Sequence, residues 1–134
     1  MQHITVLGLG KVGQLVAILL QRAGFKVTGV DSKIPAVKVP YKTQTADLTQ
    51  AADLKRVLKG AEAVVSCLPF YLNKNVATAA VAASVHYFDL TEDVPTTDYI
   101  MGLSKKAKTL LAPQCGLAPG LIGMIGAHLA SQFD

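Results

Sequence analysis

Short apolar stretches alternate with amphipathic stretches along the whole of this 134-residue chain. Six of the apolar stretches have the length and composition of buried strands. We expect these strands at residues 3–7, 26–31, 42–46, 63–68, 86–89 and 109–112. Between them, apolar residues recur every three or four positions, which is the period of a helix. The pattern therefore predicts strands and helices in alternation.

The predicted helices are bounded by residues that favour helix ends. Apolar residues at 12, 16, 19 and 23 indicate a first helix, which Gly24 would terminate. The same spacing indicates helices before Gly60, over residues 72–83, from Pro95 through residue 107, and from residues 119–120 to residue 129. Residues 32–40 hold two prolines and no helical period, so we expect a loop there.

The first predicted strand runs directly into a Gly-x-Gly-x-x-Gly motif made of Gly8, Gly10 and Gly13, and the second strand ends in Asp31. Gly8 allows a tight turn, Gly10 leaves room for a pyrophosphate, and Gly13 lets the helix pack against the strand. The helix would direct its free N–H groups and its positive dipole end at the phosphates. Asp31 lies where a carboxylate would accept hydrogen bonds from an adenosine ribose. The arrangement indicates a dinucleotide site.

Strands that alternate with helices predict right-handed crossovers and a parallel sheet. With the glycine motif, this favours a doubly wound α/β Rossmann fold of six strands in the order 3-2-1-4-5-6. We expect one domain over residues 1–134. Because the chain ends soon after the sixth strand, we interpret it either as a binding module or as the first domain of a longer enzyme.

Composition narrows the function classes. The chain is 51% apolar and 16% charged, which suits a sheet buried on both faces. No apolar run reaches the ~18 residues of a membrane span, and no signal peptide precedes the first strand, so we expect a soluble cytoplasmic protein without a membrane partner. The net charge is +4, but the lysines are mostly scattered, and aromatic residues are few. We therefore expect no nucleic-acid partner.

Asp31 favours NAD over NADP, because its carboxylate would repel a 2′-phosphate, although Lys33 could partly offset that repulsion. Its alternative is a solvated acid at a strand end. Asp47 could approach the adenine, or it could be a helix N-cap, since Asp47 and Gln50 have capping-box spacing. The sequence leaves both alternatives open.

The later strand ends carry the remaining candidates. Residues 66–69 would border the nicotinamide half of the cofactor, or Pro69 would simply end the strand. Most of the acids in residues 89–93 should cap the next helix, and one could face substrate. Residues 113–120 hold two glycines and two prolines before a helix start. That helix start could hold an anion or the nicotinamide carboxamide, or the segment could be an exit loop without a ligand.

The cysteines and histidines favour no metal site and no nucleophile. Cys67 and Cys115 lack metal-ligand spacing, and the three histidines lie far apart in the sequence. No basic residue lies beside Cys67 to lower its pKa, so we expect it in the core. No histidine lies near Cys115, which argues against a nucleophile there as well.

Taken in order, four segments of the chain resemble a known family. They are residues 6–13, residues 63–70 with Asn73, Asn75 and Val76, residues 87–90, and residues 116–120. They are similar to the N-terminal Rossmann domain of the saccharopine dehydrogenase and lysine 6-dehydrogenase family. The second and fourth segments are the more specific ones.

The resemblance implies an NAD(P)-dependent oxidoreductase that acts on the C–N bond of an amino acid. NAD is the expected cofactor, with NADP as the alternative, and a homodimer is expected for the full-length protein. The family's second domain supplies most substrate contacts, so we expect these 134 residues alone to be inactive, with unknown catalytic residues. The competing hypothesis is a nucleotide-sensing regulatory module of the potassium-transport type. The predicted cofactor contacts are Gly8, Gly10, Lys11, Val12, Gly13, Asp31, Ser32, Asp47, Leu48, Leu68 and Pro69, and the predicted substrate-side residues are Thr91, Gly116, Pro119 and Gly120.

Overall fold

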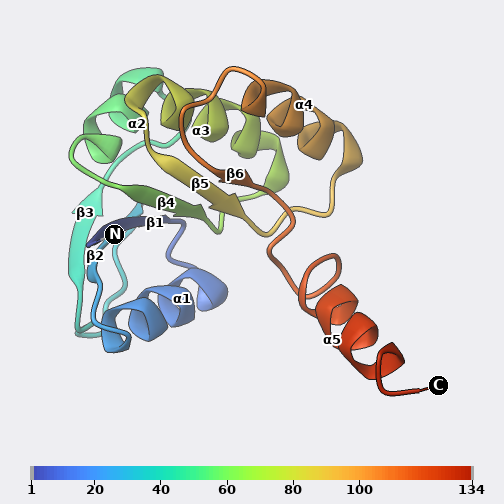
Figure 1. Ribbon diagram of the computed structural model, residues 1–134. Helices are drawn as coiled ribbons and strands as arrows, with labels where there is room; N and C mark the ends of the chain where they lie inside the picture. The colour runs from blue at the N-terminus through green and yellow to red at the C-terminus, as the bar shows by residue number, and fades with distance from the viewer. Residues whose placement is uncertain (1, 134) are drawn as a thin grey trace.

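A six-stranded parallel sheet forms the centre of the molecule (Figure 1), and the computed structural model describes residues 2–133. The strand order is β3-β2-β1-β4-β5-β6. The predicted α/β Rossmann fold and its strand order are therefore confirmed. The strands are β1 (His3–Leu7), β2 (Lys26–Asp31), β3 (Lys42–Thr45), β4 (Ala63–Ser66), β5 (His86–Asp89) and β6 (Leu111–Ala112).

Helices lie on both sides of this sheet, but not evenly. Helices α2, α3 and α4 cover one face, and α1 lies against the other face (Figure 1). Residues 32–40 form the expected loop, so no helix connects β2 to β3. The helices of the described residues are α1 (Lys11–Arg22), α2 (Ala51–Leu58), α3 (Phe70–Ala83), α4 (Val94–Ser104) and α5 (Leu121–Ala130).

Three predicted strands are longer than the observed ones, β3 by one residue and β4 and β6 by two residues each. Strand β4 ends at Ser66, because the chain after it turns toward α3 and Pro69 has no N–H to donate. Strand β6 has only two residues, because Leu110 donates its N–H to the His86 ring instead of a strand carbonyl. The prediction runs past the end of β4 and begins before the start of β6, so apolar composition marks neither boundary.

Helix α4 begins as the sequence predicts, with Pro95 in its first turn. The Asp93 carboxylate accepts a hydrogen bond from the Thr96 N–H at 2.9 Å and so caps this helix as predicted. The Asp89 carboxylate instead accepts the N–H groups of Thr91 and Gln114, so the expectation that most of these acids are caps is confirmed only for Asp93. The helix ends at Ser104, three residues before the end that the apolar spacing predicts.

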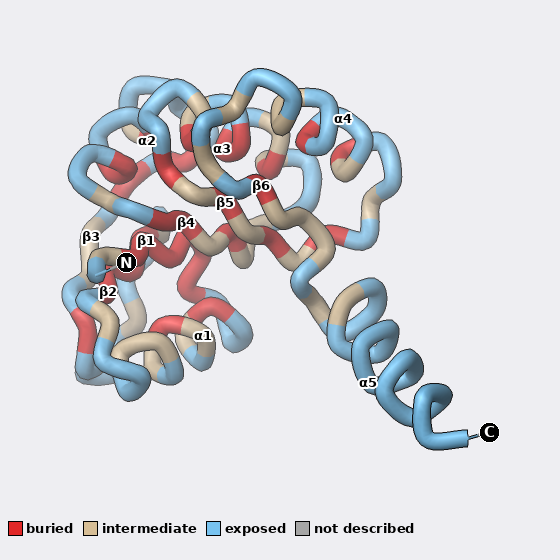
Figure 2. Tube along the Cα trace, viewed as in Figure 1, coloured by how far each residue is buried: buried red, intermediate tan, exposed pale blue. Residues whose placement is uncertain are grey.

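The core consists of two clusters on opposite faces of the sheet. The larger one lies under α2, α3 and α4 and includes Tyr87, Leu54 and Ile100, all fully buried. The smaller one lies under α1 (Figure 2). There, Gly29 of β2 leaves room for Tyr41, since a Cβ at Gly29 would lie 2.8 Å from Tyr41 Cε2. The Tyr41 ring and the Leu9 side chain thus pack directly on β2, where the chain forms no second helix.

The second face of β4, β5 and β6 is not fully covered. Val65, Phe88 and Ala112 pair in register across these strands and are all partly exposed. By contrast, Tyr87 and Leu111, which point to the other face, are buried. Helix α5 has no buried residue and extends away from the sheet (Figures 1 and 2). The expectation that both faces are buried therefore fails on this half of the sheet.

The approach of α1 to β1 generates a prediction about stability. A Cβ at Gly13 would lie 1.7 Å from the Gly8 carbonyl oxygen, so Gly13→Ala must push the helix off the strand. We expect a loss of about 3 kcal/mol in the free energy of unfolding, the upper end for overpacking. Gly102→Ala is the control, because a Cβ there meets nothing within 4 Å; it should add about 0.5–1 kcal/mol. Urea unfolding measures both, and equal stabilities would contradict the prediction.

Candidate functional site

The loop between β1 and α1 is tight on its inner side and open on its outer side. Gly8 has φ +87°, and its N–H donates to the Val30 carbonyl at 2.9 Å. A Cβ at Gly8 would lie 2.9 Å from the Cys67 carbonyl oxygen. At Gly10, the residue that precedes α1, a Cβ would meet nothing within 4 Å. The loop therefore offers an open surface directly before a helix N-terminus, where anions bind.

Asp31 lies at the end of β2, directly beside this loop. Its Oδ2 accepts a hydrogen bond from the Leu9 N–H at 2.5 Å, and its Oδ1 accepts from the Lys33 N–H at 3.3 Å. Ser32 Oγ donates to Oδ1 at 3.2 Å. Burial raises the pKa of Asp31, but these hydrogen bonds together outweigh burial and leave the pKa below its ordinary value. The carboxylate is ionised at neutral pH, and it holds the glycine loop through the Leu9 N–H. The sequence does not predict this second role.

The structure corrects one interpretation of Asp47. The residue before α2 is Gln50, so Asp47 is not the N-cap. Its Oδ1 instead accepts hydrogen bonds from the N–H and hydroxyl of Thr49, which form a turn before the helix. An approach of Asp47 to adenine stays a prediction. The Leu48 side chain is buried in the core, which leaves its backbone as the part a ligand could contact.

Three residues that the sequence analysis assigned to the site line one cavity of about 370 Å³ at the carboxyl edge of the sheet. Val12 comes from α1, Leu68 from the segment after β4, and Thr91 from the segment after β5. Pro69 is the residue before α3, and the hydrogen bond from Ser66 Oγ to Asn73 Oδ1 at 2.7 Å ties β4 to that helix. The other residues that line this cavity are Cys67, Phe70, Leu90, Glu92 and Asp93.

Residues 116–120 form a closed turn after β6. Gly116 and Gly120 form a β-bridge, and a Cβ at Gly120 would lie 2.3 Å from the Gly116 carbonyl oxygen. Pro119 lies inside this turn. The Gly116 carbonyl accepts the Leu121 N–H at 3.0 Å, and the Leu117 carbonyl accepts the Ile122 N–H at 3.0 Å. These two N–H groups at the start of α5 are therefore not available to an anion.

Neither cysteine has the properties of a nucleophile. Burial raises the pKa of Cys67 to about 11. Burial, and secondarily the negative charge of Asp89, raises the pKa of Cys115. Both thiols stay protonated at neutral pH, as expected for residues that do not attack a substrate.

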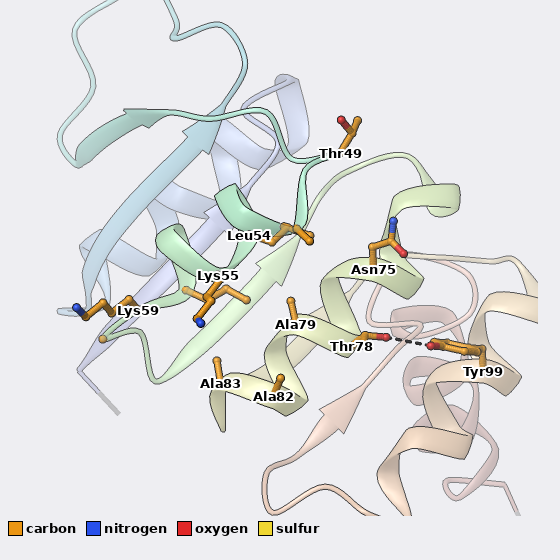
Figure 3. A pocket seen from close by; sticks show the side chains of 13 residues that line it. Thr49, Leu54, Lys55, Lys59, Asn75, Thr78, Ala79, Ala82, Ala83 and Tyr99 are labelled. Atoms are coloured by element: carbon orange, nitrogen blue, oxygen red, sulfur yellow. Dashed lines mark hydrogen bonds between the residues drawn. The ribbon is translucent and has the colours of Figure 1, made fainter.

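A larger cavity of about 970 Å³ lies among the helices α2, α3 and α4, and no residue of the glycine loop lines it. It runs between α2 and α3, with Lys55 from α2, Lys59 directly after α2, and Ala79 and Ala82 from α3 (Figure 3). Tyr99 of α4 lies at its other end and hydrogen-bonds Thr78 at 3.0 Å. None of the predicted site residues lines this cavity.

Residues 2–133 offer neither a cluster of metal ligands nor a membrane-spanning helix. No three His, Cys, Asp or Glu side chains in this part of the chain gather closely enough to hold a metal ion. None of its helices combines the length and the hydropathy that crossing a membrane requires.

A family comparison matches most of the chain. The model of the saccharopine dehydrogenase NADP binding domain matches residues 4–114. This range contains the glycine loop, Asp31 and the ends of all six strands.

Solved structures share the fold. Apo saccharopine dehydrogenase (L-Glu forming) from Saccharomyces cerevisiae superposes with a TM-score of 0.84 at 20% identity, over 98% of this chain and 31% of that one. A UDP-N-acetylglucosamine 4-epimerase from Bacillus cereus gives a TM-score of 0.68 at 15% identity, over 84% and 54% of the two chains. A short-chain dehydrogenase/reductase from Agrobacterium tumefaciens with bound NAD gives 0.67 at 17% identity, over 84% and 48%.

The open surface at Gly10 generates a prediction that separates folding from binding. Gly10→Ala should leave the melting temperature unchanged, because the added methyl meets no protein atom within 4 Å. The methyl would occupy the space that a pyrophosphate needs, so we expect NADH to bind at least about tenfold more weakly. A fluorescence titration with NADH, beside a thermal melt, measures both. Equal NADH affinities of the variant and the wild type would remove the loop from the site.

Proposed function

Because the chain belongs to the family of saccharopine dehydrogenase NADP binding domains, we propose that it binds NAD(P) for an oxidoreductase that acts on the C–N bond of an amino acid. The chain spans about a third of the yeast saccharopine dehydrogenase that it matches, 31% of that chain. The substrate and the activity of a complete enzyme are therefore part of this proposal.

One observation carries the proposal, namely the hydrogen bond between the Leu9 N–H and the Asp31 carboxylate. It holds a ribose-binding acid directly against a phosphate-binding loop, so one ligand with both groups can contact the two at once. The open surface at Gly10 fits such a ligand. The nicotinamide ring would supply hydride chemistry, and the chain's own residues bind and orient the cofactor.

We infer a preference for NAD over NADP from the same carboxylate. Asp31 is ionised, and a 2′-phosphate on the adenosine ribose would meet its negative charge. The description of the matched family names NADP, so Asp31 is the feature of this chain that argues for NAD. Lys33 follows on an exposed loop and is the nearest basic residue along the sequence.

We further propose that the substrate lies between the sheet edge and a second protein surface. Thr91, Gly116, Pro119 and Gly120 would form the wall that this chain contributes. Beyond that wall, Leu117 is 66% exposed and Ile125 is 44% exposed. Exposed apolar side chains such as these favour contact with another domain or with a second copy of the chain.

Asp31→Ser tests the cofactor preference. The change removes both an acceptor for the ribose hydroxyls and a charge that repels a 2′-phosphate. We expect weaker NADH binding and a relative gain for NADPH of about 1–2 kcal/mol. Asp98→Ser is the matched control, because it removes the same charge from an exposed position on α4. If the wild type already prefers NADPH, the assignment of Asp31 is wrong, and Lys33 becomes the residue to examine.

The proposal also predicts binding without turnover for these 134 residues. They should bind NADH, but they should produce no NADH from NAD with saccharopine or lysine, because one wall of the site is missing. Absorbance of NADH over time measures turnover, and a fluorescence titration measures binding. Steady NADH production would contradict the proposed division of the site, and binding of ATP in preference to NADH would favour a nucleotide-sensing module.

A further inference from the structure

The carboxylate of Asp89 is fully buried at the end of β5. Its Oδ1 accepts two backbone hydrogen bonds, from the Thr91 N–H and from the Gln114 N–H, both at 3.0 Å. Its Oδ2 accepts the Tyr87 hydroxyl at 2.6 Å. Within residues 2–133, no lysine or arginine forms an ion pair with it. Three donors therefore compensate for a buried carboxylate that no cation neutralises.

These hydrogen bonds join two segments that are far apart in the sequence. Thr91 belongs to the chain that leaves β5, and Gln114 belongs to the chain that leaves β6. The Asp89 carbonyl also accepts the Cys115 N–H at 2.8 Å. Gln114 has φ +65°, a conformation that is uncommon for a residue with a side chain. The bond to Asp89 thus holds the turn that directs the chain toward Gly116.

The two segments also contact each other where the predicted substrate-side residues lie. A Cβ at Gly116 would lie 3.2 Å from the Leu90 carbonyl oxygen, so the two backbones approach closely. Leu90 and Thr91 line the cavity of about 370 Å³ at the sheet edge. This edge lies on the other side of β1 from Asp31, where the nicotinamide end of a dinucleotide would extend.

We propose that Asp89 is a positioning residue that fixes these two segments as one wall for the nicotinamide end of the cofactor. The inference rests on the proposed function, since it assumes that a dinucleotide binds along the sheet edge. Asp89 itself is fully buried and touches neither the cofactor nor the substrate. It acts through Thr91, Gln114 and Cys115.

The experiment compares two ligands on four proteins. NADH contains the nicotinamide end, whereas ADP-ribose contains only the adenosine and pyrophosphate end. Asp89→Ala should bind NADH about tenfold more weakly and ADP-ribose within about twofold of the wild type. Asp89→Asn should restore NADH affinity, because its Oδ1 can accept both N–H groups while its Nδ2 donates to the Tyr87 hydroxyl.

Val85→Ala is the matched control for a loss of stability. Val85 is buried just before the opposite end of the same strand, so its truncation removes core contacts without touching either segment. It should leave the ratio of the two affinities unchanged. If Val85→Ala alters this ratio as Asp89→Ala does, or if Asp89→Ala weakens both ligands equally, the positioning role is overturned.

A measurement on the wild type covers the case in which Asp89→Ala fails to fold. In ¹⁵N spectra, NADH should shift the amide signals of Thr91, Gln114 and Cys115, and ADP-ribose should leave them in place. Unchanged signals with bound NADH would overturn the inference while the proposed function stands. If neither ligand binds the wild type, the proposed function itself fails.

Discussion

The close contact between the start of α1 and the end of β1 is the constraint on which the rest of the site depends. The Gly13 backbone lies so near the Gly8 carbonyl that no side chain fits between them. This contact sets the direction of α1, and with it the direction of the N–H groups at its first turn. The Gly8 N–H bond to Val30 and the Leu9 N–H bond to Asp31 then attach the loop to β2. Two strands and one helix thus hold the loop in place through its backbone.

Acids at strand ends organise both halves of the carboxyl edge. Asp31 at the end of β2 accepts N–H groups from the glycine loop and from its own loop, and Asp89 at the end of β5 accepts N–H groups from the segments after β5 and β6. The two carboxylates differ in exposure, because Asp31 is half-buried beside open surface and Asp89 is fully buried. An acid with free surface beside it can also contact a ligand, whereas a buried one can only hold the residues that do.

The sequence predicts the fold well, because the strand order follows from local signals. Alternating strands and helices, the glycine motif and Asp31 indicate the topology without any knowledge of distant contacts. What it predicts less well depends on tertiary partners. The capping interpretation of Asp47 was wrong, because its carboxylate accepts the N–H and the hydroxyl of Thr49 instead of an N–H of α2. The sequence does not predict the role of Asp89, because its partner Gln114 lies in a different loop. The open face of β4–β6 follows from the position of α5, which local periodicity does not encode.

The two edge strands of the sheet have a consequence for self-association. Unpaired backbone groups on a long edge strand would serve as a template for strands of other molecules. Here one edge strand is β3, which has four polar residues from Lys42 to Thr45. The other edge strand is β6, which is only two residues long. Both offer too little unpaired backbone for a stable added strand, and Lys42 places a charge at the longer of them. Fibril-like stacking through the sheet is therefore disfavoured, and any lasting association of this chain must come from its side chains rather than its backbone.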